Sequence, residues 1–481
     1  MVDIGFHFDN SYTRLPQTLF TRQPPVPVSK PELILFNQAL AKAMGLDFSV
    51  INHAAQAELL SGNQLPQGAD PIAQAYAGYQ FGHFTMLGDG RAIVLGEHLT
   101  PSYQRLDIQY KGSGRTPYSR RGDGRAALSP MLREYIISEA MHSLGVPTTR
   151  SLAITTTGET VWRETALPGA ILTRVASSHL RIGTFEYAAS QQNYSLLQTL
   201  LEYTIDRHYP ELKEVNNKAF ALLKAVMTRQ TDLIVNWMRI GFIHGVMNTD
   251  NITLSGETID YGPCAFIDAY NPHTVFSAID RSGRYAYGNQ PVILQWNLAR
   301  FAETLLPLID DNIEHAAALA EETLNAFSKF YEEKWLDMMR GKLGLFAAQA
   351  NDQILIEQLL NWMYKNNADY TNTFRDLMSE TIPTQEIYHS AEFQAWHQLW
   401  QARLALNPKP LSEAFKLMRT NNPVIIPRNH IVEQALQAAS NEQDLKPLHA
   451  LLAVLTQPYT RPKNKYYLEP SLEAYQTFCG T

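Results

Sequence analysis

The chain has 481 residues, which corresponds to about three domains of ordinary size or to one large fold with additions. Hydrophobic residues make up 45% and charged residues 18%, values typical of folded globular proteins, which excludes an overall disordered or fibrous chain. The formal net charge of -7 argues against a protein that binds nucleic acid through its overall field.

The sequence also argues against membrane and secretory classes. It contains no run of 18 apolar residues, and its first charged residue is the acid Asp3, which does not fit a signal or transit peptide. Only two cysteines occur, Cys264 and Cys479, too few for a disulfide framework or a cysteine-rich zinc site. We therefore expect a cytoplasmic protein without membrane or nucleic-acid partners.

Residues 1–70 are expected to form an N-terminal extension. A proline-rich stretch at residues 23–27 precedes a pattern that predicts a helix over residues 29–45. Ser29 and Glu32 have the spacing of a capping box, Pro31 suits the first turn, and Gly45 suits the end.

Residues 71–195 consist of short alternating runs separated by glycines, a pattern that predicts a mainly antiparallel sheet with a hairpin turn at Thr157-Gly158. One helix interrupts the sheet, with Ser129 as N-cap, Pro130 in the first turn and Gly145 at the end.

Helices are predicted for most of the remaining chain, divided into residues 196–340 and 341–481. Apolar residues at helical spacing mark residues 220–238 and 313–340, the second ending at Gly341. A sheet-rich part followed by a helical part predicts an α+β fold of two lobes with a cleft between them, and ligand sites favour such clefts.

A lysine and a glutamate stand out in the sheet-rich part. Alternation along residues 106–111 places Lys111 on the polar face of a strand, and Glu134 lies in the helix that follows. Nucleotide-binding kinases use such a pair to hold phosphates, although a solvated lysine and a helix-face glutamate explain the two residues equally well.

Phosphate binding is also suggested by two neighbouring segments. Residues 88–91 read Gly-Asp-Gly-Arg, which is either a turn whose amides approach a phosphate or a plain Asp-Gly hairpin turn. Residues 111–125 hold five basic side chains against the single acid Asp123. That density suits the polyphosphate of a small ligand, and the acidic balance of the chain disfavours the competing nucleic-acid patch. The P-loop and Rossmann fingerprints do not occur.

Residues 251–260 predict a metal site. If Ser255-Gly256 is a two-residue hairpin turn, Asn251 lies directly opposite Asp260, with Cβ atoms about 5 Å apart. Both oxygens could then ligate one Mg²⁺ while phosphates fill other positions. The alternative is an Asx turn at Asn251 and a solvated aspartate.

The segment HGVMNTDN (residues 244–251) followed by Asp260-Tyr261-Gly262 resembles the kinase catalytic loop H-R-D-x-x-x-x-N and the D-F-G motif. Val246 stands where a kinase has its catalytic aspartate, which argues against ordinary phosphoryl transfer to a hydroxyl.

The amino-acid sequences of several segments closely resemble those of the selenoprotein O family. These segments are YKGSGRTPYSRRGDGR (110–125), Arg133-Glu134, HGVMNTDN (244–251) and DYGP (260–263), and the likeness runs from FDNSY (8–12) to the final CGT (479–481). Members are kinase-like proteins that transfer AMP from ATP to protein hydroxyls. The resemblance implies the same activity, with protein substrates, release of pyrophosphate and self-modification as a further outcome.

The resemblance also implies roles for individual residues. It makes Asp250 the proton acceptor, and Asn251 and Asp260 the Mg²⁺ ligands. It also implies that the nucleotide binds in a reversed orientation. The residues on the glycine loop are then Gly88, Gly90 and Arg91. The phosphates are bound by Lys111, which Glu134 orients, and by Arg174 and Arg181, while Asp123 and Gly124 lie near the base and ribose.

Alternatives stay open at this point. UTP and Mn²⁺ could replace ATP and Mg²⁺, and the same fold could serve a phosphotransferase or an inactive pseudokinase that binds partners. Cys479 stands where some family members carry selenocysteine, and Cys264 is its only intramolecular partner for a redox-sensitive bridge. Two unbridged cysteines, with Cys264 simply buried, are the other interpretation.

Overall fold

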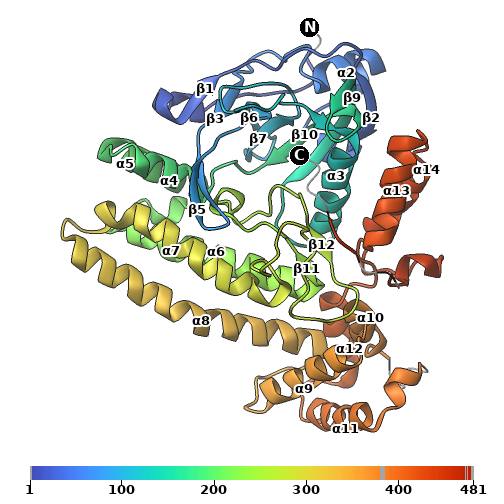
Figure 1. Ribbon diagram of the computed structural model, residues 1–481. Coiled ribbons are helices and arrows are strands. Elements are labelled where there is room, and N and C mark those ends of the chain that lie inside the picture. Colours follow the sequence, from blue (N-terminus) through green and yellow to red (C-terminus); the bar gives the residue numbers. More distant parts are fainter. Residues whose placement is uncertain (1–2, 380–384, 472, 474, 478–481) are drawn as a thin grey trace.

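The computed structural model describes residues 3–379, 385–471, 473 and 475–477. These residues form a mixed α and β structure in which an antiparallel sheet comes first in the chain and helices dominate afterwards (Figure 1). Fourteen α-helices lie within the described ranges, and none of them is long and apolar enough to cross a membrane.

The main sheet pairs its neighbouring strands antiparallel, as the alternating pattern predicts. Its spatial order is β1 (Phe20–Arg22), β3 (Ile72–Gln74), β6 (Ala92–Leu99), β7 (Arg105–Lys111), β10 (Ala166–Ala176), β9 (Arg150–Trp162) and β2 (Glu32–Phe36), with β8 (Ala126–Ala127) paired to β10.

Strand β7 lies near the middle of this sheet and presents two faces. Ile108 and Tyr110 enter an apolar cluster on one side. Gln109 and Lys111 point to the other side, where α3 (Leu128–Ser143) packs over β9 and β10. Because alternate residues of a strand face opposite ways, Lys111 is directed toward the helix that carries Glu134.

Two small sheets lie between the main sheet and the helices. Strands β4 (Ala77–Gln80) and β5 (His83–Met86) form a hairpin that contacts α4 (Ile182–Ser190). Strands β11 (Phe242–Ile243) and β12 (Ala265–Phe266) pair with each other and flank the segment that contains the short 3-10 turn Thr249–Asn251.

Most of the remaining helices build the lower part of the molecule in Figure 1, whereas α2 (His53–Leu60) lies near its top and the last two helices of the chain lie beside α3. Helix α13 (Asn429–Asn441) packs against α3 although about 300 residues separate their sequences. The other helices are α1 (Gln38–Ala43), α5 (Tyr194–His208), α6 (Lys218–Ile240), α7 (Gln290–Ile309), α8 (Ile313–Leu343), α9 (Asp352–Lys365), α10 (Tyr370–Asp376), α11 (Ala391–Ala405), α12 (Leu411–Asn421) and α14 (Lys446–Leu455).

The predicted helix over residues 29–45 is wrong in its first half. Glu32–Phe36 is strand β2, paired with β9, and the helix is confined to Gln38–Ala43. Asn37 caps that helix by accepting a hydrogen bond from the Leu40 amide (3.0 Å). Pairing with an edge of the sheet therefore overrides the local capping pattern at Ser29.

Three other boundaries differ from expectation. Gly158 is not in a hairpin turn, since β9 runs on to Trp162 and Gly158, with φ +71°, lies at an irregularity in the β9–β10 register. Helix α3 begins at Leu128, and its N-cap is Ala127, two residues before the expected N-cap Ser129. Helix α8 continues past Gly341 and ends at Gly344, whose φ is +72°.

Candidate functional site

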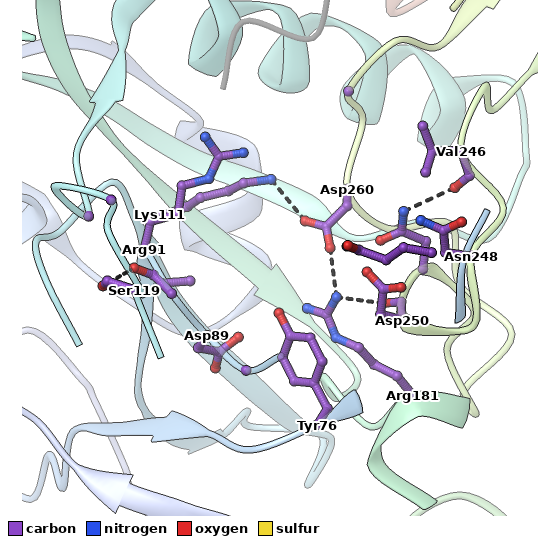
Figure 2. A pocket seen from close by; sticks show the side chains of 18 of the residues that line it. Tyr76, Asp89, Arg91, Lys111, Ser119, Arg181, Val246, Asn248, Asp250 and Asp260 are labelled. Atoms are coloured by element: carbon purple, nitrogen blue, oxygen red, sulfur yellow. Dashed lines mark hydrogen bonds and ion pairs between the residues drawn. The ribbon is translucent and has the colours of Figure 1, made fainter. Parts of the chain in front are cut away.

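A cavity of about 480 Å³ brings together residues from distant parts of the chain (Figure 2). Its lining comes from the loop before β6, from β7, from the loop before β8, from β10 and from the segment between β11 and β12. The sequence-predicted residues that line it are Gly88, Gly90, Arg91, Lys111, Asp123, Gly124, Arg174, Arg181, Asp250, Asn251 and Asp260.

The carboxylate of Asp260 lies among three cations in this cavity. Lys111 Nζ and Arg174 Nη1 donate to Oδ1 over 2.8 and 2.6 Å, and Arg181 Nη1 donates to Oδ2 over 2.7 Å. Figure 2 shows Lys111 and Arg181 reaching Asp260 from different sides. Burial alone would raise the pKa of Asp260, but the three positive charges outweigh it and hold the pKa well below its usual range.

Glu134 supplies the second carboxylate of this cluster, from the helix rather than from the cavity wall. Its Oε2 accepts from Lys111 Nζ (2.6 Å) and its Oε1 accepts from Arg174 Nη1 (3.1 Å). Three cations thus face two carboxylates, and a net positive charge remains. Such an arrangement suits the oxygens of a polyphosphate.

The two arginines are oriented by residues that the sequence analysis missed. Arg174 Nε donates to Gln109 Oε1 (3.1 Å), and the Arg181 guanidinium lies 4.5 Å from the centre of the Tyr76 ring. Tyr76 precedes β4 without any motif around it, so only its aromatic character was available as a signal. The cation–π contact fixes Arg181 in the cavity wall.

Asp89 is a second residue whose role the sequence did not reveal. The segment at residues 88–91 is not a hairpin turn but a loop between β5 and β6. Asp89 Oδ2 accepts from the Gln74 amide (3.0 Å), which joins the loop to β3. Burial raises the pKa of Asp89 to about 6, an effect that the nearby Arg181 partly offsets.

Two glycines of the cavity wall occupy positions that a side chain would not fit. Gly88 has a φ of +137°, and a Cβ there would lie 2.7 to 2.9 Å from Tyr118 at two of its nearest atoms. Gly124 has a φ of +70°, and a Cβ there would overlap the backbone of Gly114 and the Arg115 amide nitrogen. Both positions therefore keep the backbone close to the cavity.

The basic run at residues 111–125 contributes less than its density suggests. Lys111 and Arg125 line the cavity, whereas Arg120 donates to the Met86 carbonyl (2.6 Å). Asp123 is paired with Arg163 (2.8 Å), which lines the cavity in addition. Of the five basic side chains, Lys111 and Arg125 line this cavity.

Asp250 differs from Asp260 because its carboxyl has no cation partner among the described residues. Its side chain lines the cavity, its Oδ1 is buried, and its backbone carbonyl accepts from Arg181 Nη1 (2.7 Å). Burial raises the pKa of Asp250 to about 6, and the charge of Arg181 counters this only in part. A carboxyl in this state can accept a proton near neutral pH.

The predicted hairpin that pairs Asn251 with Asp260 is wrong. Residues 251–260, all of them described, form a loop in which Thr253 bridges to Arg181 and Thr258 bridges to Thr148. Asp260 has a left-handed φ of +59° instead of an extended one. The two candidate metal ligands nevertheless line the same cavity, because the loop is held by its neighbours rather than by itself.

The donor set at this loop fits Mg²⁺. Asn251 Nδ2 donates to the Val246 carbonyl (3.0 Å), which orients the amide so that its oxygen is available, and Asp260 supplies carboxylate oxygens. The described residues contain no group of three or more His, Cys, Asp or Glu that could hold a metal ion alone. Mg²⁺ commonly binds through one or two protein oxygens together with substrate phosphates, which matches this set.

A second cavity of about 680 Å³ adjoins the first at Lys111 and Gly262. It lies between α3, α13 and residues 475–477. Thr477 Oγ1 donates to the Pro263 carbonyl (3.0 Å), next to Cys264. Cys264 is buried, and burial raises the pKa of its thiol to about 11. Cys479 lies outside the described residues.

Comparison with known proteins gives the cavity its context. The buried cluster of cations around Asp260 suits phosphate oxygens. The family profile described as "Protein adenylyltransferase SelO" matches residues 4–456. "Protein nucleotidyltransferase YdiU" of Alcanivorax borkumensis is 60% identical over 481 residues, 99% of each chain. The proteins of the same name from Nitrosococcus oceani and Bacillus cytotoxicus are 59% and 56% identical, covering all of this chain and 98% of their own. The chain therefore belongs to the SelO family of protein adenylyltransferases.

We expect Asp260→Ala and Asn251→Ala each to lower metal-dependent nucleotide transfer by about 100-fold or more, because each removes an oxygen donor from the metal and phosphate cluster. Transfer of label from α-labelled ATP to protein, with and without Mg²⁺, measures this. Thermal unfolding checks the fold, and the exposed Asp311→Ala serves as a control. Full metal-dependent activity in either variant would contradict the two-residue metal site.

Proposed function

We propose that this chain transfers AMP from ATP to Ser, Thr or Tyr hydroxyls of proteins and releases pyrophosphate, on a protein-kinase-like fold whose sheet-rich and helical lobes are residues 71–195 and 196–340. The supporting observation is that one cavity holds two different carboxyl groups. Asp260 is bonded to cations, and Asp250 has no cation partner among the described residues. The first suits a metal and phosphates, and the second suits proton transfer. Membership in the family supports the choice of AMP.

In this proposal the phosphate oxygens replace the Asp260 carboxylate as the hydrogen-bond acceptors of the three cations. Lys111, Arg174 and Arg181 bind phosphate oxygens, and Glu134 keeps Lys111 in place. The backbone at Gly88 and Gly90 with Arg91 covers the phosphates, while Asp123 and Gly124 lie near the base and ribose. The wall is rich in guanidinium groups, which stabilise the charge that develops on leaving pyrophosphate.

Asn251 and Asp260 are the residues that would hold Mg²⁺ in this cavity. When bound, the metal supplies positive charge to the phosphates. Asp250 accepts the proton of the acceptor hydroxyl as its oxygen bonds to the α-phosphorus. The bond between the α-phosphorus and the bridging oxygen breaks at the same centre, and its electron pair leaves with pyrophosphate.

Val246 favours nucleotidyl transfer over phosphotransfer in this proposal. It lines the cavity at the position where a kinase loop carries its base, and it cannot accept a proton. A phosphotransferase therefore lacks the usual carboxylate, and a partner-binding pseudokinase does not account for the cluster of Lys111, Arg174 and Arg181. Assays with UTP in place of ATP, and with Mn²⁺ in place of Mg²⁺, decide which nucleotide and which metal the protein uses.

With ATP labelled at the α-phosphate we expect label to appear on protein, and with ATP labelled at the γ-phosphate we expect none, because the β- and γ-phosphates leave together. A bacterial lysate heated to inactivate its own enzymes provides the acceptors, and the enzyme alone tests self-modification. Transfer of the γ label would establish a phosphotransferase instead.

Asp250→Ala should lower the maximal transfer rate by about 100-fold or more while ATP binding stays within about threefold, because a base acts on the acceptor rather than on the nucleotide. Calorimetric titration with ATP and Mg²⁺ separates binding from turnover. A variant that transfers at the wild-type rate would exclude Asp250 as the base.

A redox bridge between Cys264 and Cys479 is a further part of the proposal. Thr477, two residues before Cys479, already bonds to Pro263, the neighbour of Cys264. We expect oxidised glutathione to convert the two thiols into a disulfide and reductant to change the transfer rate. Mass mapping and assays of Cys479→Ser, which should not respond to reductant, test this. An unbridged oxidised protein with constant activity would contradict it.

A further inference from the structure

The carboxyl of Asp250 packs directly on the backbone of β4. A Cβ added to Gly78 would lie 2.9 Å from both Cβ and Cγ of Asp250, and closer still to its Oδ1. Distances under 3.0 Å are not tolerated between such atoms, so even an alanine at this position would displace the aspartate. Glycine at residue 78 therefore lets the strand touch the acid.

The start of α4 closes the same contact from another side. A Cβ on Gly183 would overlap the Ala77 carbonyl oxygen and would lie 3.4 Å from Asp250 Cα. The residue before α4, Arg181, bonds to the Asp250 carbonyl, and the Ile182 amide bonds to the Ile252 carbonyl (2.9 Å). The turn that carries Asp250 is thus enclosed between β4 and the first turn of α4.

A buried glutamate fastens this turn one residue before Asp250. Thr249 Oγ1 donates to Glu186 Oε2 on α4 (2.7 Å) and accepts from the Tyr79 amide on β4 (2.8 Å). Glu186 is 4% exposed, and its Oε1 has no hydrogen-bond partner within the described part of the chain. A buried, half-satisfied carboxyl is costly, which indicates a use beyond stability.

Among the described residues no side chain donates a hydrogen bond to the Asp250 carboxyl, and the backbone hydrogen bond that it receives comes from its own residue. Its Oδ1 is buried against Gly78 without a hydrogen-bond partner, as far as the described residues extend. Its orientation therefore depends on packing against β4 and on the bonds of its neighbours. We propose that Gly78 and the Thr249–Glu186 hydrogen bond position the Asp250 carboxyl for proton transfer, an inference that rests on the proposed function of Asp250 as base.

We name Gly78, Thr249 and Glu186 the Asp250 clamp. All three lie outside the wall of the cavity, so they do not contact the nucleotide site. They hold the β4–β5 hairpin (residues 77–86) against the turn at residues 249–251, although about 170 residues separate the two segments. A misplacement of a reacting group by about 1 Å can cost about 100-fold in rate, which makes the clamp a determinant of turnover rather than of binding.

The test compares turnover with nucleotide binding in clamp variants. Gly78→Ala should lower the apparent kcat for transfer of α-label to heated lysate protein by about 100-fold, with KM for ATP and calorimetric ATP affinity within about threefold. His83→Ala, at an exposed side chain on β5 of the same hairpin and outside the cavity lining, is the control and should behave as wild type.

A pair of variants at Thr249 tests the hydrogen bond without adding bulk. Thr249→Val should lower kcat by about tenfold, the scale of one lost hydrogen bond, and Thr249→Ser should recover most of the rate because it keeps the hydroxyl. KM for ATP should stay constant in both. The pair keeps the inference testable even where Gly78→Ala unfolds.

The outcomes separate the clamp from the assignment of the base. An inactive Asp250→Ala beside an unchanged kcat in Gly78→Ala and Thr249→Val would overturn the clamp alone. Equal losses of ATP affinity and kcat in the clamp variants would also overturn it, because they would indicate a merely structural role. Full activity in Asp250→Ala would overturn the proposed base, and the clamp with it.

Discussion

The site depends on one carboxylate that neutralises three buried or nearly buried cations. Asp260 bonds to Lys111, Arg174 and Arg181, and without it only Glu134 would compensate their charge. Removing one member of such a cluster leaves an uncompensated buried charge, which is strongly unfavourable. The left-handed backbone of Asp260, with φ +59°, is held in place by this same set of bonds. A polyphosphate can relieve the constraint by taking over the cations, which links ligand binding to the freedom of Asp260.

The cluster in turn depends on the register of the main sheet. Lys111 lies opposite Leu172, and Arg174 lies opposite Gln109, to which it bonds. Side chains of directly opposed residues share a face, so both cations project toward α3 and Glu134. A slip of one residue would turn them into the apolar cluster on the other face of the sheet. The alternation of apolar and polar residues along β7 therefore specifies the charge arrangement as well as the fold.

Sequence patterns predicted those features of the site that depend on residues close together in the chain. The alternation around Lys111 and the helix that carries Glu134 were both visible in the sequence, as were the motif at residues 244–251 and the antiparallel sheet. The pairing of Asn251 with Asp260 was wrong because Thr253 and Thr258 form β-bridges with Arg181 and Thr148, which are far away in the chain. Tyr76 and Asp89 were missed for the same reason: their contacts with Arg181 and Gln74 exist only after folding. Strand β2 replaced part of a predicted helix because an open position beside β9 was invisible locally.

Asp250 and Asp260 are held in opposite ways, and this difference supports the two roles proposed for them. Asp260 is held by the charges of three cations, so its pKa lies well below the usual range and it stays an anion. Asp250 packs against Gly78, and burial raises its pKa to about 6, an effect that the charge of Arg181 counters only in part. An ion pair to Asp250 would have oriented it better but would have made it a weaker base. Packing against Gly78 of the β4–β5 hairpin can orient the Asp250 carboxyl without that loss, because the guanidinium of Arg181 bonds to the Asp250 backbone carbonyl and not to its carboxyl.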